Sequence, residues 1–307
     1  MDKVASYTAA GTFPTKLIGC AFLESSNIKP FHVQLNPTNL CNLNCSFCSC
    51  ANKENISLSV YDIVDIMNKF VRLGCKAVTI TGGGEPLLYQ GINNVIDWLY
   101  SLGVQTGLVT NGTKLADLQT DKLTWVRVSA SDSRFFEADI LKKAVQRLPD
   151  IDWSLSYVLS EDPDIDNIMK VIEFANKFNF THVRIVSDLL NLENVSMVNI
   201  MKHAKHIDHK VIYQPRKEYT HGTKDCWISL LKPVVGADGK LYPCCGVQYA
   251  EKEPSLNYNE GMCMGTDIDT IWERQIRFDG SKCVKCYYSA YNDILSQIKR
   301  ISHRIFL

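Results

Sequence analysis

Three cysteines at C-x3-C-x2-C spacing constrain this chain of 307 residues more than any other feature. Cys41, Cys45 and Cys48 lie within eight residues, directly after a short apolar run. Thiols this close together cannot all bridge one another comfortably, but each can bind a different iron of one cuboidal cluster. A four-iron cluster with three thiolate ligands keeps one iron open for another ligand. The spacing therefore predicts an open [4Fe-4S] cluster; a structural zinc site completed by Cys50 or a distant His is the alternative.

Composition limits the cellular setting and the classes of partner. Lys plus Arg and Asp plus Glu both total 33, so no net charge favours nucleic acid, although a nucleic-acid partner stays open. No stretch approaches the roughly 20 apolar residues of a membrane helix, and the N-terminus lacks a signal-peptide pattern. We therefore expect a cytoplasmic protein with no membrane partner. In that reducing compartment, the twelve cysteines indicate metal ligands rather than disulfides.

Alternating strand and helix patterns follow one another along the first two thirds of the chain. Strands are expected at residues 31–35, 77–81, 104–109, 125–130, 152–159 and 182–187, and helices at 57–73, 91–102, 134–147 and 164–178. The first helix has a plausible cap at Ser57 and should end at Gly74. This order predicts an α/β fold with parallel strands, either a barrel or an open sheet.

A glycine-rich turn, Gly82-Gly83-Gly84-Glu85-Pro86, follows the second expected strand. Parallel α/β folds place their ligand sites at this end of a strand. Glycines there let the backbone approach a ligand closely. By itself such a turn is also typical of an ordinary loop.

Taken together, the cysteine triplet, Phe47 before its last Cys and the GGEP turn resemble the radical S-adenosylmethionine (SAM) superfamily. The resemblance implies a partial (β/α)6 TIM-like barrel over residues 31–215. It implies that SAM chelates the open iron and is cleaved to a 5′-deoxyadenosyl radical after reduction by a donor such as flavodoxin or ferredoxin. The cofactor would then supply the difficult chemistry, and the protein would supply position and shielding.

The same resemblance implies a set of cofactor-binding residues. These are Gly83, Gly84, Glu85, Asn111, Ser129 and Asp132. The glycines and Glu85 would contact the methionine end of SAM, and the Ser129 to Asp132 segment its carboxylate and ribose. The alternatives are a helix N-cap for this segment and a turn residue for Asn111.

A second group of cysteines follows residue 225. Its members are Cys226, Cys244, Cys245, Cys263, Cys283 and Cys286. A β-hairpin expected over Pro233–Tyr242 would bring Cys226 and Cys244 together. With the Cys283-x-x-Cys286 pair they supply four thiolates, suited to zinc or to an iron–sulfur cluster.

This C-terminal pattern resembles the twitch domain, a shorter relative of the SPASM domain in radical SAM enzymes. The resemblance implies one auxiliary [4Fe-4S] cluster held by the four thiolates, and leaves Cys245 and Cys263 unassigned. The expected domains are an N-terminal extension over 1–30, the barrel over 31–215, and a twitch-like domain with a C-terminal helix over 216–307.

Three functions follow as hypotheses. The first is a radical SAM oxidoreductase or isomerase that abstracts hydrogen from a small molecule or peptide. The second is radical SAM modification of a nucleotide or nucleic-acid base. The third, from another class, is a non-catalytic scaffold that binds zinc or a cluster. Fold-level resemblance does not separate oxidation from rearrangement.

Overall fold

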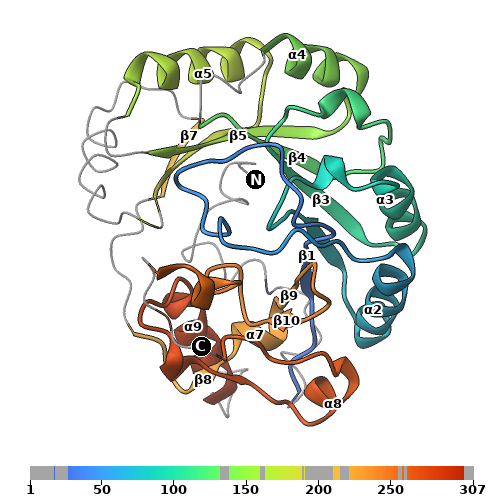
Figure 1. Ribbon diagram of the computed structural model, residues 1–307, viewed down its shortest axis with the longest axis vertical. Helices are drawn as coiled ribbons and strands as arrows, with labels where there is room; N and C mark the ends of the chain where they lie inside the picture. Colours follow the sequence, from blue (N-terminus) through green and yellow to red (C-terminus); the bar gives the residue numbers. More distant parts are fainter. Residues whose placement is uncertain are drawn as a thin grey trace, which may run out of the picture.

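The structure is a computed structural model that describes residues 17, 27–131, 138–159, 163–188, 190, 210–214, 221–254, 258 and 261–300. Over these residues the main sheet has nine strands in the order β10-β9-β1-β2-β3-β4-β5-β6-β7 (Figure 1). Its strands are β1 (His32–Leu35), β2 (Ala77–Ile80), β3 (Gln105–Thr110), β4 (Trp125–Ser129), β5 (Asp152–Leu159), β6 (Val183–Ser187), β7 (Val211–Gln214), β9 (Val234–Val235) and β10 (Leu241–Tyr242). A separate antiparallel pair joins β8 (Asp225–Cys226) to β11 (Phe278–Asp279).

Helices follow most of the parallel strands and lie outside the curved sheet in Figure 1. They are α2 (Val60–Leu73), α3 (Ile92–Ser101), α4 (Ala138–Arg147) and α5 (Ile165–Lys177), followed in the C-terminal part by α7 (Ile228–Leu231), α8 (Ile268–Glu273) and α9 (Ser289–Arg300). All neighbouring pairs from β1 to β7 are parallel. The predicted α/β class and the partial TIM-like barrel are therefore confirmed.

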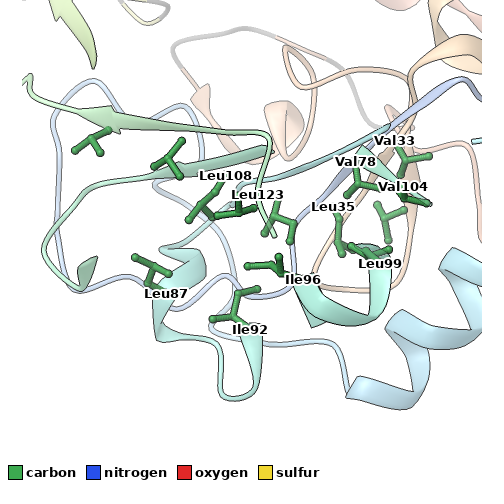
Figure 2. Packing of buried hydrophobic residues seen from close by; sticks show 14 of the residues in the cluster. Val33, Leu35, Val78, Leu87, Ile92, Ile96, Leu99, Val104, Leu108 and Leu123 are labelled. Carbon is green, nitrogen blue, oxygen red and sulfur yellow. The ribbon is translucent and has the colours of Figure 1, made fainter. Parts of the chain in front are cut away.

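The two faces of the sheet differ in chemistry because successive side chains in a strand point to opposite sides. Val33 and Leu35 of β1 are buried against the helical layer, where Figure 2 shows Leu35 beside Leu99 of α3. The alternate residue Gln34 points to the other face. That inner face carries the polar side chains of the barrel.

The start of α2 differs from the prediction. Ser59, not Ser57, is the N-cap, and it forms a capping box with Asp62. Ser57 instead bridges to Thr38, with 2.7 Å between the two hydroxyl oxygens, which keeps the chain extended two residues longer. The predicted end is confirmed, because Gly74 has a φ of 108° and caps the helix in the left-handed conformation.

The C-terminal part contributes two strands to the main sheet. The expected hairpin is confirmed as β9 and β10, which pair antiparallel around Gly239, whose φ is +74°. Strand β9 also pairs parallel with β1, where Gln34 N donates to Pro233 O at 3.0 Å. In Figure 1 the remaining C-terminal elements gather beside this edge. The expected boundary at residues 215 and 216 lies outside the described residues.

Candidate cluster and cofactor sites

The cysteine triplet occupies the loop that leaves the carboxyl end of β1. Cys41 is exposed, and Cys45 and Cys48 are half-buried. A turn brings the last two together, with Cys48 N donating to Cys45 O at 3.1 Å. Across the described ranges, no three His, Cys, Asp or Glu side chains are placed to bind one metal ion. A cuboidal cluster has a different requirement, because each thiolate binds its own iron.

The glycine-rich turn after β2 packs directly on the backbone that leads into this loop. Gly84 N donates to Thr38 O at 3.1 Å, and Glu85 N donates to Leu40 O at 2.7 Å. A Cβ atom on Gly84 would lie 2.0 Å from Leu40 O, and one on Gly83 would lie 2.1 Å from Asn39 Oδ1. These two glycines are therefore required by the approach of the cluster loop itself.

Glu85 is only 2% exposed, and its carboxylate is directed into the protein. It accepts hydrogen bonds from Leu87 N at 2.9 Å, from Thr110 Oγ1 at 2.6 Å and from Asn111 N at 2.7 Å. Burial raises the pKa of this carboxyl, while the three donors act in the opposite direction. The carboxylate thus joins the end of β2 to the end of β3, and direct contact with SAM stays a prediction.

Asn111 connects the same two strand ends to the cluster loop. Its Nδ2 donates to Asn42 Oδ1 at 3.0 Å, and Asn42 Nδ2 donates to Thr113 Oγ1 at 2.9 Å. Thr113 Oγ1 in turn donates to Asn111 Oδ1 at 2.7 Å. Asn42 and Thr113 are not among the site residues predicted from the sequence. The available signal was the asparagine between the first two cysteines of the triplet.

Ser129 ends β4 on the inner face, in register with Ser156 of β5. Its hydroxyl oxygen lies 3.3 Å from that of Ser131, which accepts a hydrogen bond from Val158 N at 2.9 Å. Asp132 lies outside the described residues. The structure therefore places Ser129 at the correct edge of the barrel for the predicted contact, which stays a prediction.

The C-terminal part also touches the segment around the cysteine triplet. Asn36 Nδ2 donates to Gln248 Oε1, and Asn39 Nδ2 donates to Tyr249 Oη at 3.1 Å. Asn36 Oδ1 and Gln248 Nε2 are buried without a hydrogen-bond partner. Such atoms at the mouth of the barrel suit a polar ligand such as SAM, because buried polar groups are otherwise costly.

The four predicted auxiliary ligands line one pocket. They are Cys226, Cys244, Cys283 and Cys286. Burial raises the pKa of Cys226 to about 11 and that of Cys283 to about 12. Neighbouring thiols of the set contribute to both of these increases. The donor set fits a cluster, because four cysteine thiolates are the usual ligands of iron–sulfur centres and a bound metal would deprotonate them.

Close packing and a side-chain hydrogen bond hold this pocket together. A Cβ atom on Gly222 would lie 2.0 Å from Gly280 O, and Gly222 N donates to Cys283 O at 3.0 Å. Asn292 Oδ1, in α9, accepts a hydrogen bond from Ile228 N at 2.9 Å. The β8–β11 pair and α9 thus position the cysteines from three separate parts of the chain.

The two unassigned cysteines do not line the auxiliary pocket. Cys245 is exposed, and its Sγ lies 3.3 Å from Tyr288 Oη. Cys263 Sγ accepts a hydrogen bond from Gly265 N at 3.1 Å. Cys50 packs with Tyr242 and Tyr249 in a small buried cluster beside the triplet.

A sequence model of the radical SAM superfamily matches residues 35–204, more than half of the chain. The chain belongs to the radical SAM superfamily. It is therefore an enzyme whose cofactors are a [4Fe-4S] cluster and SAM, which decides against the non-catalytic scaffold. The described residues include no helix long and apolar enough to span a membrane.

Two individual relatives have low sequence identity to this chain. The GTP 3′,8-cyclase of Helicobacter pylori (strain ATCC 700392 / 26695) is 24% identical over 281 residues, which cover 76% of this chain and 87% of the relative. The 7-carboxy-7-deazaguanine synthase of Clostridium acetobutylicum is 26% identical over 195 residues, 58% of this chain and 85% of the relative.

Solved structures show the same fold. Streptococcus suis SuiB bound to precursor peptide SuiA superposes with a TM-score of 0.57 at 17% identity, covering 85% of this chain and 69% of SuiB. At this identity the likeness shows the fold alone.

Proposed function

We propose that this radical SAM enzyme abstracts hydrogen from an unactivated carbon of its substrate, leading to oxidation or rearrangement of a small molecule or peptide. The observation that carries the proposal is the presence of two separate thiol sets, three on the loop after β1 and four around one pocket. Three thiolates suit an open cluster and four suit a closed one. The proposal combines a radical-forming centre with a second redox centre.

Residues at the mouth of the barrel would hold the first centre and its cofactor. Cys41, Cys45 and Cys48 would bind the cluster, whose reduction supplies the electron that cleaves SAM. The proposed cofactor contacts are Gly83, Gly84, Glu85, Asn111, Ser129 and Asp132. Glu85 and Asn111 would also hold the cluster loop in place, because Asn111 N donates to Glu85 and Asn111 Nδ2 donates to Asn42 of that loop. An electron donor such as flavodoxin or ferredoxin is part of this proposal.

The second centre would be an auxiliary [4Fe-4S] cluster bound by Cys226, Cys244, Cys283 and Cys286. With four thiolates no iron would stay open for SAM. Its role would be to accept an electron from the substrate or to help position it. The twitch-like division of the chain near residue 216 belongs to the same proposal.

Modification of a nucleotide is the second candidate. It is supported by the two relatives named above as a GTP 3′,8-cyclase and a 7-carboxy-7-deazaguanine synthase. The peptide-bound SuiB structure supports the first candidate only through its fold.

Anaerobic reconstitution with iron and sulfide tests the proposal most directly. We expect about eight irons and eight sulfides per chain, from two four-iron clusters. Reduced protein should convert SAM to 5′-deoxyadenosine. Stoichiometric zinc with no sulfide, or no 5′-deoxyadenosine from fully reconstituted protein, would contradict it.

A further inference from the structure

Segment 248–253 of the C-terminal part bonds to the chain on both sides of the cysteine triplet. Before the triplet, Asn39 Nδ2 donates to Tyr249 Oη at 3.1 Å. After it, Asn52 Nδ2 donates to Glu253 Oε2 at 2.9 Å. The second bond is exposed to solvent, whereas Asn39 and Tyr249 are both buried. The buried bond is therefore the one whose loss would cost more.

Tyr249 lies between the two parts of the predicted cofactor site. The Asn39 amide that its hydroxyl accepts from is two residues before Cys41. A Cβ atom on Gly83 would lie 3.1 Å from Cε2 of Tyr249, so the ring packs close against the glycine-rich turn. Cys50, on the far side of the triplet, belongs to the same small buried cluster as Tyr249. One phenol thus touches the cluster loop and the glycine-rich turn together.

The backbone of Tyr249 adopts a conformation that is rare for tyrosine. Its φ is +58° and its ψ is 14°, in the left-handed region. A residue with a side chain is strained there, and such strain persists where the surrounding contacts impose it, often at functional sites. In Tyr249 the strain accompanies the contacts with Asn39 and Gly83.

A short series of turns connects Tyr249 to the auxiliary pocket. Cys244 and Val247 line that pocket. Val247 N donates to Cys244 O at 3.4 Å, and Ala250 N donates to Val247 O at 3.1 Å. The residue that touches the first site is therefore held by backbone hydrogen bonds to a segment of the second.

Tyr242 lies beside Tyr249 but bonds to a different part of the chain. The two ring centroids are 5.3 Å apart, with an interplanar angle of 68°. Tyr242 Oη donates to Asp238 Oδ2 at 2.7 Å, within the β9–β10 hairpin. Tyr242 therefore offers a buried, hydrogen-bonded hydroxyl as a matched comparison for that of Tyr249.

We propose that Tyr249 is a positioning residue for SAM cleavage, which holds the cluster loop against the glycine-rich turn through Asn39. Its phenol keeps the loop where the open iron and the turn face the same cofactor. The apparent affinity for a ligand falls with the fraction of molecules in the binding-competent conformation. Loss of the hydroxyl therefore weakens SAM binding. The inference rests on the proposed function, which assigns the cluster to the triplet and SAM to the turn.

Calorimetry with SAM on full-length, reconstituted Tyr249→Phe tests the proposal. The variant keeps the ring and removes the acceptor of the buried Asn39 amide. We expect the Kd for SAM to rise about tenfold, or about 1.4 kcal/mol, with about eight irons per chain still bound. At saturating SAM, formation of 5′-deoxyadenosine should stay within about twofold of wild type, because SAM then draws the loop into position. Tyr242→Phe, the matched control, should bind SAM as wild type does.

Hydrogen exchange of the same proteins without SAM separates positioning from a general loss of stability. Peptides covering residues 36–54 should exchange faster in Tyr249→Phe than in wild type, because the loop opens more often. In Tyr242→Phe these peptides should exchange as in wild type, even if both variants melt at a lower temperature. Asn39→Ala removes the donor of the same bond. The double variant Asn39→Ala/Tyr249→Phe should therefore bind SAM no more weakly than the weaker of the two single variants.

Several results would overturn the proposal. They are unchanged SAM affinity or unchanged exchange of residues 36–54 in Tyr249→Phe, an equal loss of affinity in Tyr242→Phe, and loss of iron from Tyr249→Phe, which would assign the hydroxyl to cluster assembly. If Tyr249→Phe lacks native circular dichroism, Asn39→Ala decides the outcome by the same measurements. Wild-type protein that neither binds nor cleaves SAM would contradict the proposed function and this inference with it. Where wild type does both, the variants test the inference alone.

Discussion

The backbone N–H of Asn111 donates a 2.7 Å hydrogen bond to Oε2 of Glu85, although the two residues are 26 positions apart. This bond joins the carboxyl ends of β2 and β3. The Asn111 side chain also donates a hydrogen bond to Asn42, which lies between the first two cysteines. The buried Glu85 carboxylate therefore holds the cluster loop indirectly, through Asn111. The acidic residue of the GGEP turn is thus built into the framework of the site.

Replacing Glu85 by Ala should lower both stability and SAM affinity. Three donors lose their acceptor, and each buried unsatisfied donor costs about 1–3 kcal/mol. Allowing for relaxation, we expect a loss of roughly 2–4 kcal/mol in unfolding free energy, and weaker SAM binding by calorimetry. The visible absorbance of the clusters should persist. Glu273→Ala, which removes an exposed carboxylate in α8, is the control. If Glu85→Ala bound SAM as tightly as wild type, Glu85 would not belong to the SAM site.

Replacing Cys41, Cys45 or Cys48 singly by Ala should abolish reductive cleavage of SAM while the fold survives. The reason is that the open cluster loses one of its three ligands. The measurement is 5′-deoxyadenosine formed under anaerobic reduction. Cys50→Ala, in the same loop but packed against Tyr242 and Tyr249, should retain cleavage. A normal yield from any of the three variants would refute the ligand assignment.

Replacing Cys283 and Cys286 together should separate cofactor cleavage from substrate turnover. About four irons per chain should remain, from the first cluster alone, and substrate-free cleavage of SAM should persist. Turnover of substrate should fall because the second redox centre is lost. The buried Cys75, outside both sites, provides Cys75→Ala as a control. Eight irons in the double variant would show that these thiols do not bind the auxiliary cluster.

His182 should make the protein less stable in mild acid. Burial, with the nearby charges of Arg127 and Arg184, lowers the pKa of this imidazole to about 4. The unfolded chain takes up the proton near pH 6.5, so stability is full above that pH and is lost as the pH falls toward 4. The total loss is roughly 3 kcal/mol for a shift of this size.

Melting temperatures at pH 7 and pH 5 measure this effect. The decrease between the two values should be smaller in His182→Gln than in wild type, whereas the exposed His221→Gln should behave as wild type. Equal decreases in wild type and His182→Gln would assign the acid sensitivity to other groups.

Local patterns predicted the parallel strands and the two cysteine sets, because spacing and periodicity act within a few residues. The same local patterns predict the α2 cap at Ser57. The error arose from Thr38, which draws Ser57 into a bridge and leaves Ser59 as the cap. A contact with a residue 19 positions away carries no local signal.

Long-range contacts also explain what else the sequence left undetermined. The GGEP motif predicts glycines that make room for a ligand, yet Gly84 first makes room for the carbonyl of Leu40. The inward direction of Glu85 depends on donors supplied by Thr110 and Asn111 of the next strand unit. Neither contact can be inferred from the motif alone.

Strand β9 lies on the free side of β1, so the C-terminal part covers what would otherwise be an open edge of the barrel. A fragment ending near residue 215 would expose the unpaired N–H and C=O groups of β1 to other chains. Exposed edges of this kind promote intermolecular strand pairing. The loop with the first three cysteines follows that strand, so shortening the protein would endanger its solubility and its radical-forming centre together.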